Sequence, residues 1–139
     1  MDITSSPTSE SNSIANLVAH IRGAVHSRIE IILLDIPDIR NRDKEFEKGL
    51  LMSKEQAVKQ TRDAFDLLIQ YLEQIKSHPE LLMSQPFINL PALTYSQVNN
   101  ETTALNLMMA MFREIHFHTG QIIYAAKIRK GQLVWKYDK

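Results

Sequence analysis

The chain has 139 residues, of which 44% are hydrophobic and 23% are charged, and it contains no cysteine. This size and composition are typical of one compact globular domain, and the lack of cysteine excludes disulfides, thiolate zinc sites and cysteine nucleophiles. The 16 basic residues balance the 16 acidic ones, so the charge gives no indication of a nucleic-acid or acidic-membrane partner.

The N-terminus is polar and rich in serine. It lacks the basic start and apolar run of a signal peptide, and the longest apolar runs of the chain are too short to span a bilayer; we therefore expect a cytoplasmic protein. Residues 1–11 are predicted to be a disordered lead-in. Residues 12–139 are predicted to form a single helical domain.

A first long helix is predicted to begin after Asn12 or Ser13, since either side chain can act as N-cap. Apolar residues then recur at helical spacing to about Leu34, and Pro37 ends the pattern. Such spacing places them on one broad face that is expected to enter the core. The residues of this face are Ile14, Leu17, Val18, Ile21, Val25, Ile29 and Ile32.

Residues 35–52 form a charged connection, in which the run RNRDKEFEK is interpreted as a solvated loop. A second helix is predicted to begin at SKEQ, because Ser53 and Gln56 fit a capping box, and to end at His78 before Pro79. Its apolar face is predicted from spacings of three and four residues. The face contains Val58, Thr61, Phe65, Leu68, Leu72 and Ile75.

Residues 79–99 include several prolines and are predicted to be a long loop with one helical turn near Glu80–Met83. A third helix is predicted to follow an N-cap at Asn99 or Asn100 and to end at Gly131, behind a basic last turn. The tail after Gly131 is expected to pack back on the bundle. The predicted apolar face of this helix contains Ala104, Leu105, Met108, Phe112, Ile115, Thr119, Ile122 and Ala126.

The segment REIHFHTGQ contains two histidines one residue apart, His116 and His118. Successive residues of a helix turn by about 100°, so these two side chains cannot chelate one ion together. Glu114 lies one turn before His118 on the same border of the apolar face, and two ligands at this spacing can coordinate one metal ion. His20, at the margin of the first helix's apolar face, offers a third ligand.

Three ligands from two helices would leave coordination positions open, which is typical of a catalytic metal site. Imidazole and carboxylate ligands suit zinc, nickel, iron or manganese. The alternative interpretation is an ordinary hydrogen bond or ion pair between Glu114 and His118, with His20 as a half-buried structural residue. Three further histidines are expected to be structural or solvent-facing: His26 and His78, which have no suitable partner in the sequence, and His116.

Three stretches resemble segments of the DinB/YfiT superfamily and occur in the same order. SNSIANLVAHIRGAVHSR is similar to the segment with the first metal histidine, NRDKEFE to a loop of an uncharacterised branch, and EIHFHTGQIIYAAKIRKGQLVWK to the closing helix. The resemblance implies an all-α, up-and-down bundle of four helices that often holds a divalent metal through three histidines. Relatives include metal-dependent hydrolases and enzymes that act with low-molecular-weight thiols.

Carried over by position, the first and last family histidines fall on His20 and His118, and the middle one falls on Glu114. Because glutamate binds the same metals, the resemblance implies a His/Glu/His site in a metal-dependent hydrolase or thiol transferase with a small-molecule substrate. Gln121 and Tyr124 are candidates for supporting or substrate-contacting roles, and no catalytic residue is assigned. The change at Glu114 also suits a second hypothesis, a metal-free dimeric bundle with a binding or structural role.

The resemblance also implies a helix before the first segment, where this chain has only the polar residues 1–12. Three amphipathic helices would leave open the groove that a fourth helix fills, and an apolar groove of this kind is normally covered. We expect a homodimer whose subunits cover each other's grooves. The 79–99 segment is expected to help in this or to fold over the groove itself.

Overall fold

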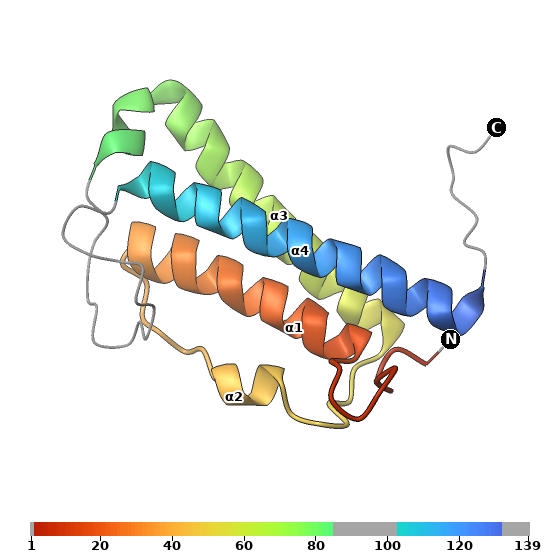
Figure 1. The fold of residues 1–139 in the computed structure, drawn as a ribbon. Helices are drawn as coiled ribbons and strands as arrows, with labels where there is room; N and C mark the ends of the chain where they lie inside the picture. The colour runs from red at the N-terminus through yellow and green to blue at the C-terminus, as the bar shows by residue number, and fades with distance from the viewer. Residues whose placement is uncertain (1, 85–102, 132–139) are drawn as a thin grey trace.

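The computed structural model describes residues 2–84 and 103–131. Within these ranges the chain forms helices and no strand (Figure 1). This confirms the predicted all-helical bundle of three long helices. The elements are α1 (Ile14–Val25), its π-helical continuation η1 (His26–Leu33), α2 (Arg42–Glu45), α3 (Lys54–Ser77), the 3-10 turn η2 (Pro79–Met83) and α4 (Ala104–Lys130).

Local capping chemistry sets the helix boundaries. Ser13 caps α1, and Ser53 caps α3 in the predicted capping box with Gln56. The start of α4 differs from the prediction, because Thr103 is its N-cap and forms a capping box with Asn106. Asn99 and Asn100 lie outside the described residues. Gly131 follows α4 with a φ of 74°, a conformation that glycine adopts without strain.

The second half of the first helix is a π-helix, which the spacing did not predict. Residues four apart in an α-helix drift by about 40° around the axis, whereas the wider turn of a π-helix reduces this drift. The buried residues Val25, Ile29 and Leu33 are each four apart and therefore remain on one side. Leu33 belongs to the core, while the side chain of Ile32 lies outside the described part of the structure.

The first helix is the centre of the bundle. It packs against both α3 and α4, whereas the backbones of α3 and α4 do not approach each other closely along their described lengths. Figure 1 shows that α1 and α3 run in the same direction and α4 in the opposite one. The chain therefore does not alternate direction at every helix, because the 35–52 connection carries α2 back along α1.

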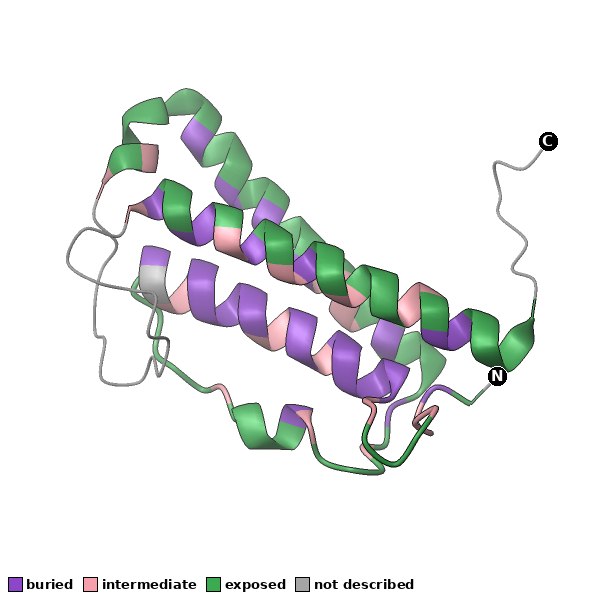
Figure 2. Cartoon of the chain, in the orientation of Figure 1, coloured by how far each residue is buried: buried purple, intermediate pink, exposed green. Residues whose placement is uncertain are grey.

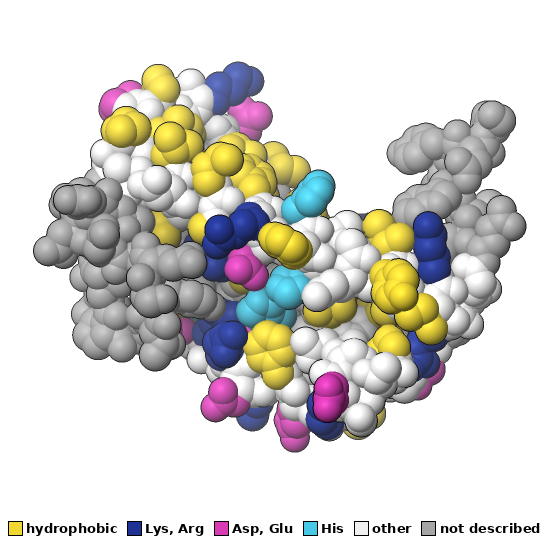
Figure 3. Space-filling model, in the orientation of Figure 1, with side chains coloured by type: hydrophobic (Ala, Val, Ile, Leu, Met, Phe, Trp, Pro, Cys, Tyr) yellow, Lys and Arg dark blue, Asp and Glu magenta, His cyan; other side chains and the backbone are white. Residues whose placement is uncertain are grey.

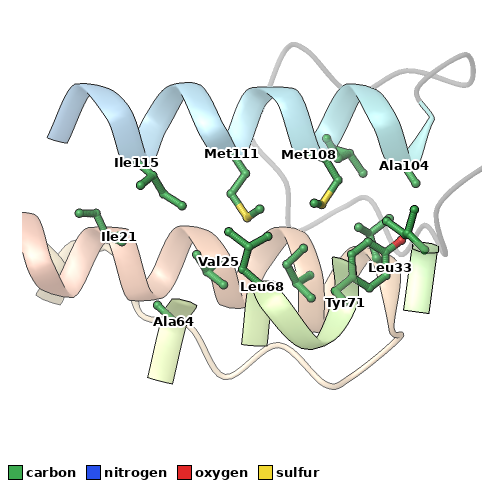
Figure 4. Packing of buried hydrophobic residues seen from close by; sticks show 13 residues of the cluster. Ile21, Val25, Leu33, Ala64, Leu68, Tyr71, Ala104, Met108, Met111 and Ile115 are labelled. Carbon is green, nitrogen blue, oxygen red and sulfur yellow. The ribbon is translucent and has the colours of Figure 1, made fainter. Parts of the chain in front are cut away.

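The main core lies where the three long helices meet (Figure 4). The first helix contributes Ile21, Val25 and Ile29, and Met111 of α4 is fully buried against them. A second cluster at the other end of the bundle includes Ile3. In addition, the carbonyl of Ile3 accepts a hydrogen bond from the Ala15 amide, a contact that the polar composition of the lead-in did not indicate.

The buried faces of α3 and α4 are rotated from the predicted ones. The predicted α3 face was wrong in part, because the helix turns small residues such as Ala57 and Ala64 toward the bundle, which allows close helix packing. Figure 2 shows exposed residues along the outer sides of both helices. Six residues of the predicted core faces of α3 and α4 are exposed, and neighbouring residues are buried in their place. The exposed residues include Val58, Phe65, Leu72, Leu105, Phe112 and Thr119, and the buried ones that replace them include Tyr71, Leu107 and Met111.

Seven of the exposed hydrophobic side chains of α3 and α4 form what we call the outer apolar face. Figure 3 shows hydrophobic side chains gathered over these two helices at the upper edge of the molecule. The face consists of Val58, Phe65, Ile69 and Leu72 on α3 and of Leu105, Met109 and Phe112 on α4.

Most of the predicted 79–99 loop lies outside the described residues, apart from the turn at Pro79–Met83, which was predicted correctly. None of the helices in the described part combines the length and apolar character that a membrane crossing requires.

Candidate metal centre

The packing of α1 on α4 brings His20, Glu114 and His118 together. One ligand atom from each residue can be chosen so that no two are more than 4.8 Å apart. The Oε2 atom of Glu114 lies 3.6 Å from His20 Nε2 and 3.3 Å from His118 Nε2. The three predicted side chains therefore form one cluster, and in the described part of the chain they are the group whose geometry could hold a metal ion.

The other nitrogen of each imidazole faces an oxygen atom. His20 Nδ1 lies 2.9 Å from Glu45 Oε2, and His118 Nδ1 lies 2.7 Å from Gln121 Oε1. These oxygens accept hydrogen bonds, so they favour the tautomer with hydrogen on Nδ1. Each Nε2 then presents a lone pair toward the Glu114 carboxylate. Three lone pairs that converge repel one another unless a cation or a proton lies between them, so the donor set fits a metal ion.

The cluster is buried on one side and open on the other. The side chain of His20 is 6% exposed, whereas those of His118 and Glu114 are 16% and 30% exposed. Figure 3 shows histidine and acidic side chains adjoining at the surface in the middle of this view. A small molecule could therefore reach the cluster from the side of α4.

Arg28 lies beside the cluster. It comes from η1, is buried, and places Nη2 4.0 Å from Glu114 Oε1. Burial by itself would raise the pKa of Glu114, but the Arg28 guanidinium, together with the charge that His118 and His20 carry when protonated, outweighs it and holds the pKa below its ordinary value. Glu114 is thus kept ionised, with Oε1 toward the guanidinium and Oε2 toward the histidines.

Glu45 is the functional candidate that the sequence interpretation missed. The prediction that RNRDKEFEK is a solvated loop is wrong at this residue, which is buried and contacts both His20 and Arg40. Burial acts to raise the pKa of Glu45, but the hydrogen bonds from Arg40 and His20 outweigh it and lower the pKa. The available signal was the likeness of NRDKEFE to a superfamily loop, because spacing alone cannot show that a short helix folds back onto α1.

The remaining predicted candidates differ in their surroundings. Gln121 contacts His118, as a supporting residue would, whereas Tyr124 is 68% exposed farther along α4. His116 is exposed, as expected. The prediction that two other histidines lack partners is wrong: His26 is hydrogen-bonded to Glu30, four residues on, and exposed His78 lies 3.2 Å from Glu80.

A family model described as Protein of unknown function (DUF1572) matches residues 1–137, so the chain belongs to this family. No curated protein and no solved structure matches the chain. The family match spans all the helices described above but carries no activity with it. An inference about function therefore depends on the chemistry of the site.

Proposed function

We propose that this member of the DUF1572 family binds a divalent transition metal through His20, Glu114 and His118 and uses it for hydrolysis or group transfer. The observation that carries the proposal is the convergence of two histidine Nε2 atoms and one carboxylate oxygen while both Nδ1 atoms face acceptors. An ordinary ion pair between Glu114 and His118 would not require His20 to present a third lone pair at the same point.

The spacing of the ligand atoms supports this proposal. Ligands with bonds of about 2.0–2.1 Å in tetrahedral geometry lie roughly 3.4 Å apart. The two separations from Glu114 Oε2, 3.6 and 3.3 Å, are close to this value. Small side-chain rotations would bring the two Nε2 atoms to the same spacing. The ligand set suits zinc, nickel, iron or manganese.

The protein residues around the site have separate roles in this proposal. His20 forms the buried wall, and His118 and Glu114 lie at the opening, where a substrate can enter. Arg28 holds Oε1 of Glu114, so that Oε2 is the oxygen directed to the metal. A bound divalent ion of this kind lowers the pKa of a water or thiol that it holds, which supplies a nucleophile near neutral pH.

The reaction class is supported by the likeness of three motifs to the DinB/YfiT superfamily. That resemblance implies hydrolysis or transfer with a low-molecular-weight thiol, and therefore a small-molecule substrate. Glu114 stands where the superfamily has its middle histidine, and a carboxylate retains ligand capacity at that position.

Elemental analysis tests the proposal. Protein purified without an affinity tag should contain near-stoichiometric zinc, nickel, iron or manganese, and His118→Ala should lose it. His116→Ala is the matched control, because His116 is an exposed histidine of the same helix and should leave the metal content unchanged. Wild-type protein that takes up none of the four metals after they are added back would overturn the proposal. Metal-loaded protein would then be screened for hydrolysis of small esters and amides and for thiol transfer.

A metal-free bundle is the second candidate, and the position of Arg28 favours it. A buried guanidinium 4.0 Å from Glu114 supplies a positive charge to the carboxylate without any metal. In that case a chelator would not change the thermal stability of the purified protein, and His20→Ala would leave its metal content at zero. A metal-dependent stabilisation of wild-type protein would exclude this candidate.

We also propose that two copies of the chain associate through the outer apolar face. Its α3 residues are Val58, Phe65, Ile69 and Leu72, which lie within about 60° of one another around the helix and are between 38% and 53% exposed. Patches of this kind are normally covered. In a symmetric antiparallel pair of α3 helices centred between Phe65 and Ile69, exposed Arg62 would face Glu73 of the second copy, so the flanking charges are complementary.

The oligomeric state tests this second proposal. Light scattering on the eluting protein should give twice the chain mass, and Ile69→Glu should give a monomer or fail to fold. Ile128→Glu is the matched control, since Ile128 is similarly exposed, at 55% against 53%, but lies outside the face. A monomeric wild-type protein at high concentration would exclude the dimer.

A further inference from the structure

The short helix α2 is fixed to α1 at the level of His20. The buried Asn16 side chain donates hydrogen bonds of 2.9 Å to the backbone carbonyls of Glu45 and Glu47. Its Oδ1 atom accepts from the Ser13 amide in the capping box of α1. Asn16, the capping-box partner of Ser13, therefore also fixes the backbone at Glu45, so the end of α2 has a set position along α1.

The carboxylate of Glu45 is held in one orientation. Arg40 donates to Oε1 from Nε at 2.6 Å and to Oε2 from Nη2 at 2.8 Å, which is a bidentate pair. Oε2 also lies 2.9 Å from His20 Nδ1. Because the side chains of Arg40 and Glu45 are each 7% exposed, solvent screens this interaction less than it would screen a surface ion pair.

Gly23 provides the space for this pair. A Cβ atom at position 23 would lie 2.0 Å from Glu45 Oε1 and 2.9 Å from Arg40 Nε. Both distances are shorter than real contacts, so any side chain at this position would displace the pair. The close approach of Glu45 to the helix that carries His20 therefore depends on the absence of a side chain at Gly23.

The ring of His20 also packs against an aromatic ring. The ring of Phe46, the residue after Glu45, lies with its centroid 4.7 Å from that of His20. The guanidinium of Arg42 in α2 lies 5.1 Å from the ring centroid of Phe46, the residue that follows this helix. The Arg40–Phe46 segment thus contacts His20 at its Nδ1 atom and at its ring, and leaves Nε2 directed toward Glu114.

We propose that Glu45, held by Arg40, is a positioning residue that fixes His20 with its hydrogen on Nδ1 and its Nε2 lone pair directed at the metal position. This inference rests on the proposed metal function and assigns to the 40–46 segment the orientation of one ligand. Oxygen acceptors on the far nitrogen of a metal-binding histidine have this effect, and their removal typically weakens metal binding by about 10–100-fold.

The first readout is metal affinity. Zinc dissociation constants measured by competition with a chelator should rise about 10–100-fold in Glu45→Ala, and Gly23→Ala should show the same direction of change. Glu47→Gln is the matched control, because Glu47 directly follows the 40–46 segment and has an exposed side chain; its affinity should equal that of wild type. An unchanged affinity in a folded Glu45→Ala protein would overturn the proposal and leave Glu45 with a structural role.

The second readout does not need metal. In metal-free protein labelled with ¹⁵N histidine, above the pH range in which imidazole titrates, nitrogen chemical shifts report which ring nitrogen carries hydrogen. Wild type and Glu47→Gln should show the Nδ1–H form of His20, and Glu45→Ala should show the other form or a mixture. A change of tautomer in a protein that binds no metal would refute the metal function alone. The same tautomer in wild type and Glu45→Ala would refute the positioning role alone.

Discussion

Replacing Met111 and Phe112 separately by alanine tests which face of α4 enters the core. The apolar spacing of the sequence selects Phe112, but in the structure Met111 is 0% exposed and Phe112 is 40% exposed. Truncation of a buried methionine to alanine typically costs 2–5 kcal/mol, because the side chain loses its contacts and leaves a cavity. The partly exposed phenylalanine loses less buried area, and we expect roughly 1 kcal/mol for its truncation.

Thermal unfolding followed by circular dichroism measures this difference. For 139 residues, an unfolding entropy of about 2.1 cal/mol/K per residue gives roughly 0.3 kcal/mol/K. A loss of about 3 kcal/mol in Met111→Ala therefore lowers Tm by about 10 °C, whereas Phe112→Ala lowers it by about 3 °C. Both variants are compared over a range of protein concentrations, because Phe112 belongs to the outer apolar face and a dimer would add a concentration-dependent term. A larger loss of Tm for Phe112→Ala than for Met111→Ala at low protein concentration would contradict the burial of the Met111 face of α4.

Three other measurements address the metal, acid stability and helix capping. Zinc at about 100 times its dissociation constant should stabilise wild type by about 2.7 kcal/mol, which raises Tm by roughly 9 °C. The Tm of His118→Ala should not change on addition of zinc, and an equal rise in that variant would mean that zinc binds at another site. Burial acts to raise the pKa of Glu30, but hydrogen bonds and charges from His26 and Arg22 hold the pKa below its ordinary value. The ionised Glu30 therefore stabilises the fold above its unfolded pKa, and this contribution is lost as the pH falls through its folded pKa. In Glu30→Gln, the free energy of unfolding should fall less steeply with decreasing pH in the acid range than in wild type. An equally steep fall in both proteins would contradict this. Thr103→Ala should destabilise the protein by about 1 kcal/mol in urea unfolding, and no effect would mean that α4 is capped elsewhere.

The exposure of the candidate metal centre is compatible with the proposed role in binding small molecules. The described structure has buried His20 at the back of the cluster and the more exposed Glu114 and His118 at its front. The charged groups around it, Arg28 beside Glu114 and the Arg40–Glu45 pair beside His20, are provided by segments that are separate in the sequence. The site therefore depends on how η1 and α2 pack, in addition to the two helices that hold the ligands.

The sequence was sufficient for features that depend on neighbouring residues along one chain segment. The N-cap at Ser13, one of the two predicted residues, the capping box at Ser53, the stop before Pro79 and the positive φ of Gly131 follow from hydrogen bonds and backbone preferences within a few residues. The pairing of Glu114 with His118 follows from helical periodicity in the same way. The addition of His20 required the assumption that the first and last helices face each other, which the bundle satisfies.

The tertiary structure alone decided which of two apolar faces α3 and α4 bury. On α3, Phe65 and Leu72 have the regular spacing of a core face, but packing on α1 turns Ala64 and Tyr71 inward and leaves Phe65 and Leu72 partly exposed. Periodicity cannot choose between two such faces, because the choice depends on how closely the backbones approach. For the same reason the sequence did not show that charged Glu45 is buried: the cost of burying a carboxylate is offset by Arg40, His20 and the space at Gly23, and these partners meet only when the chain folds back on α1.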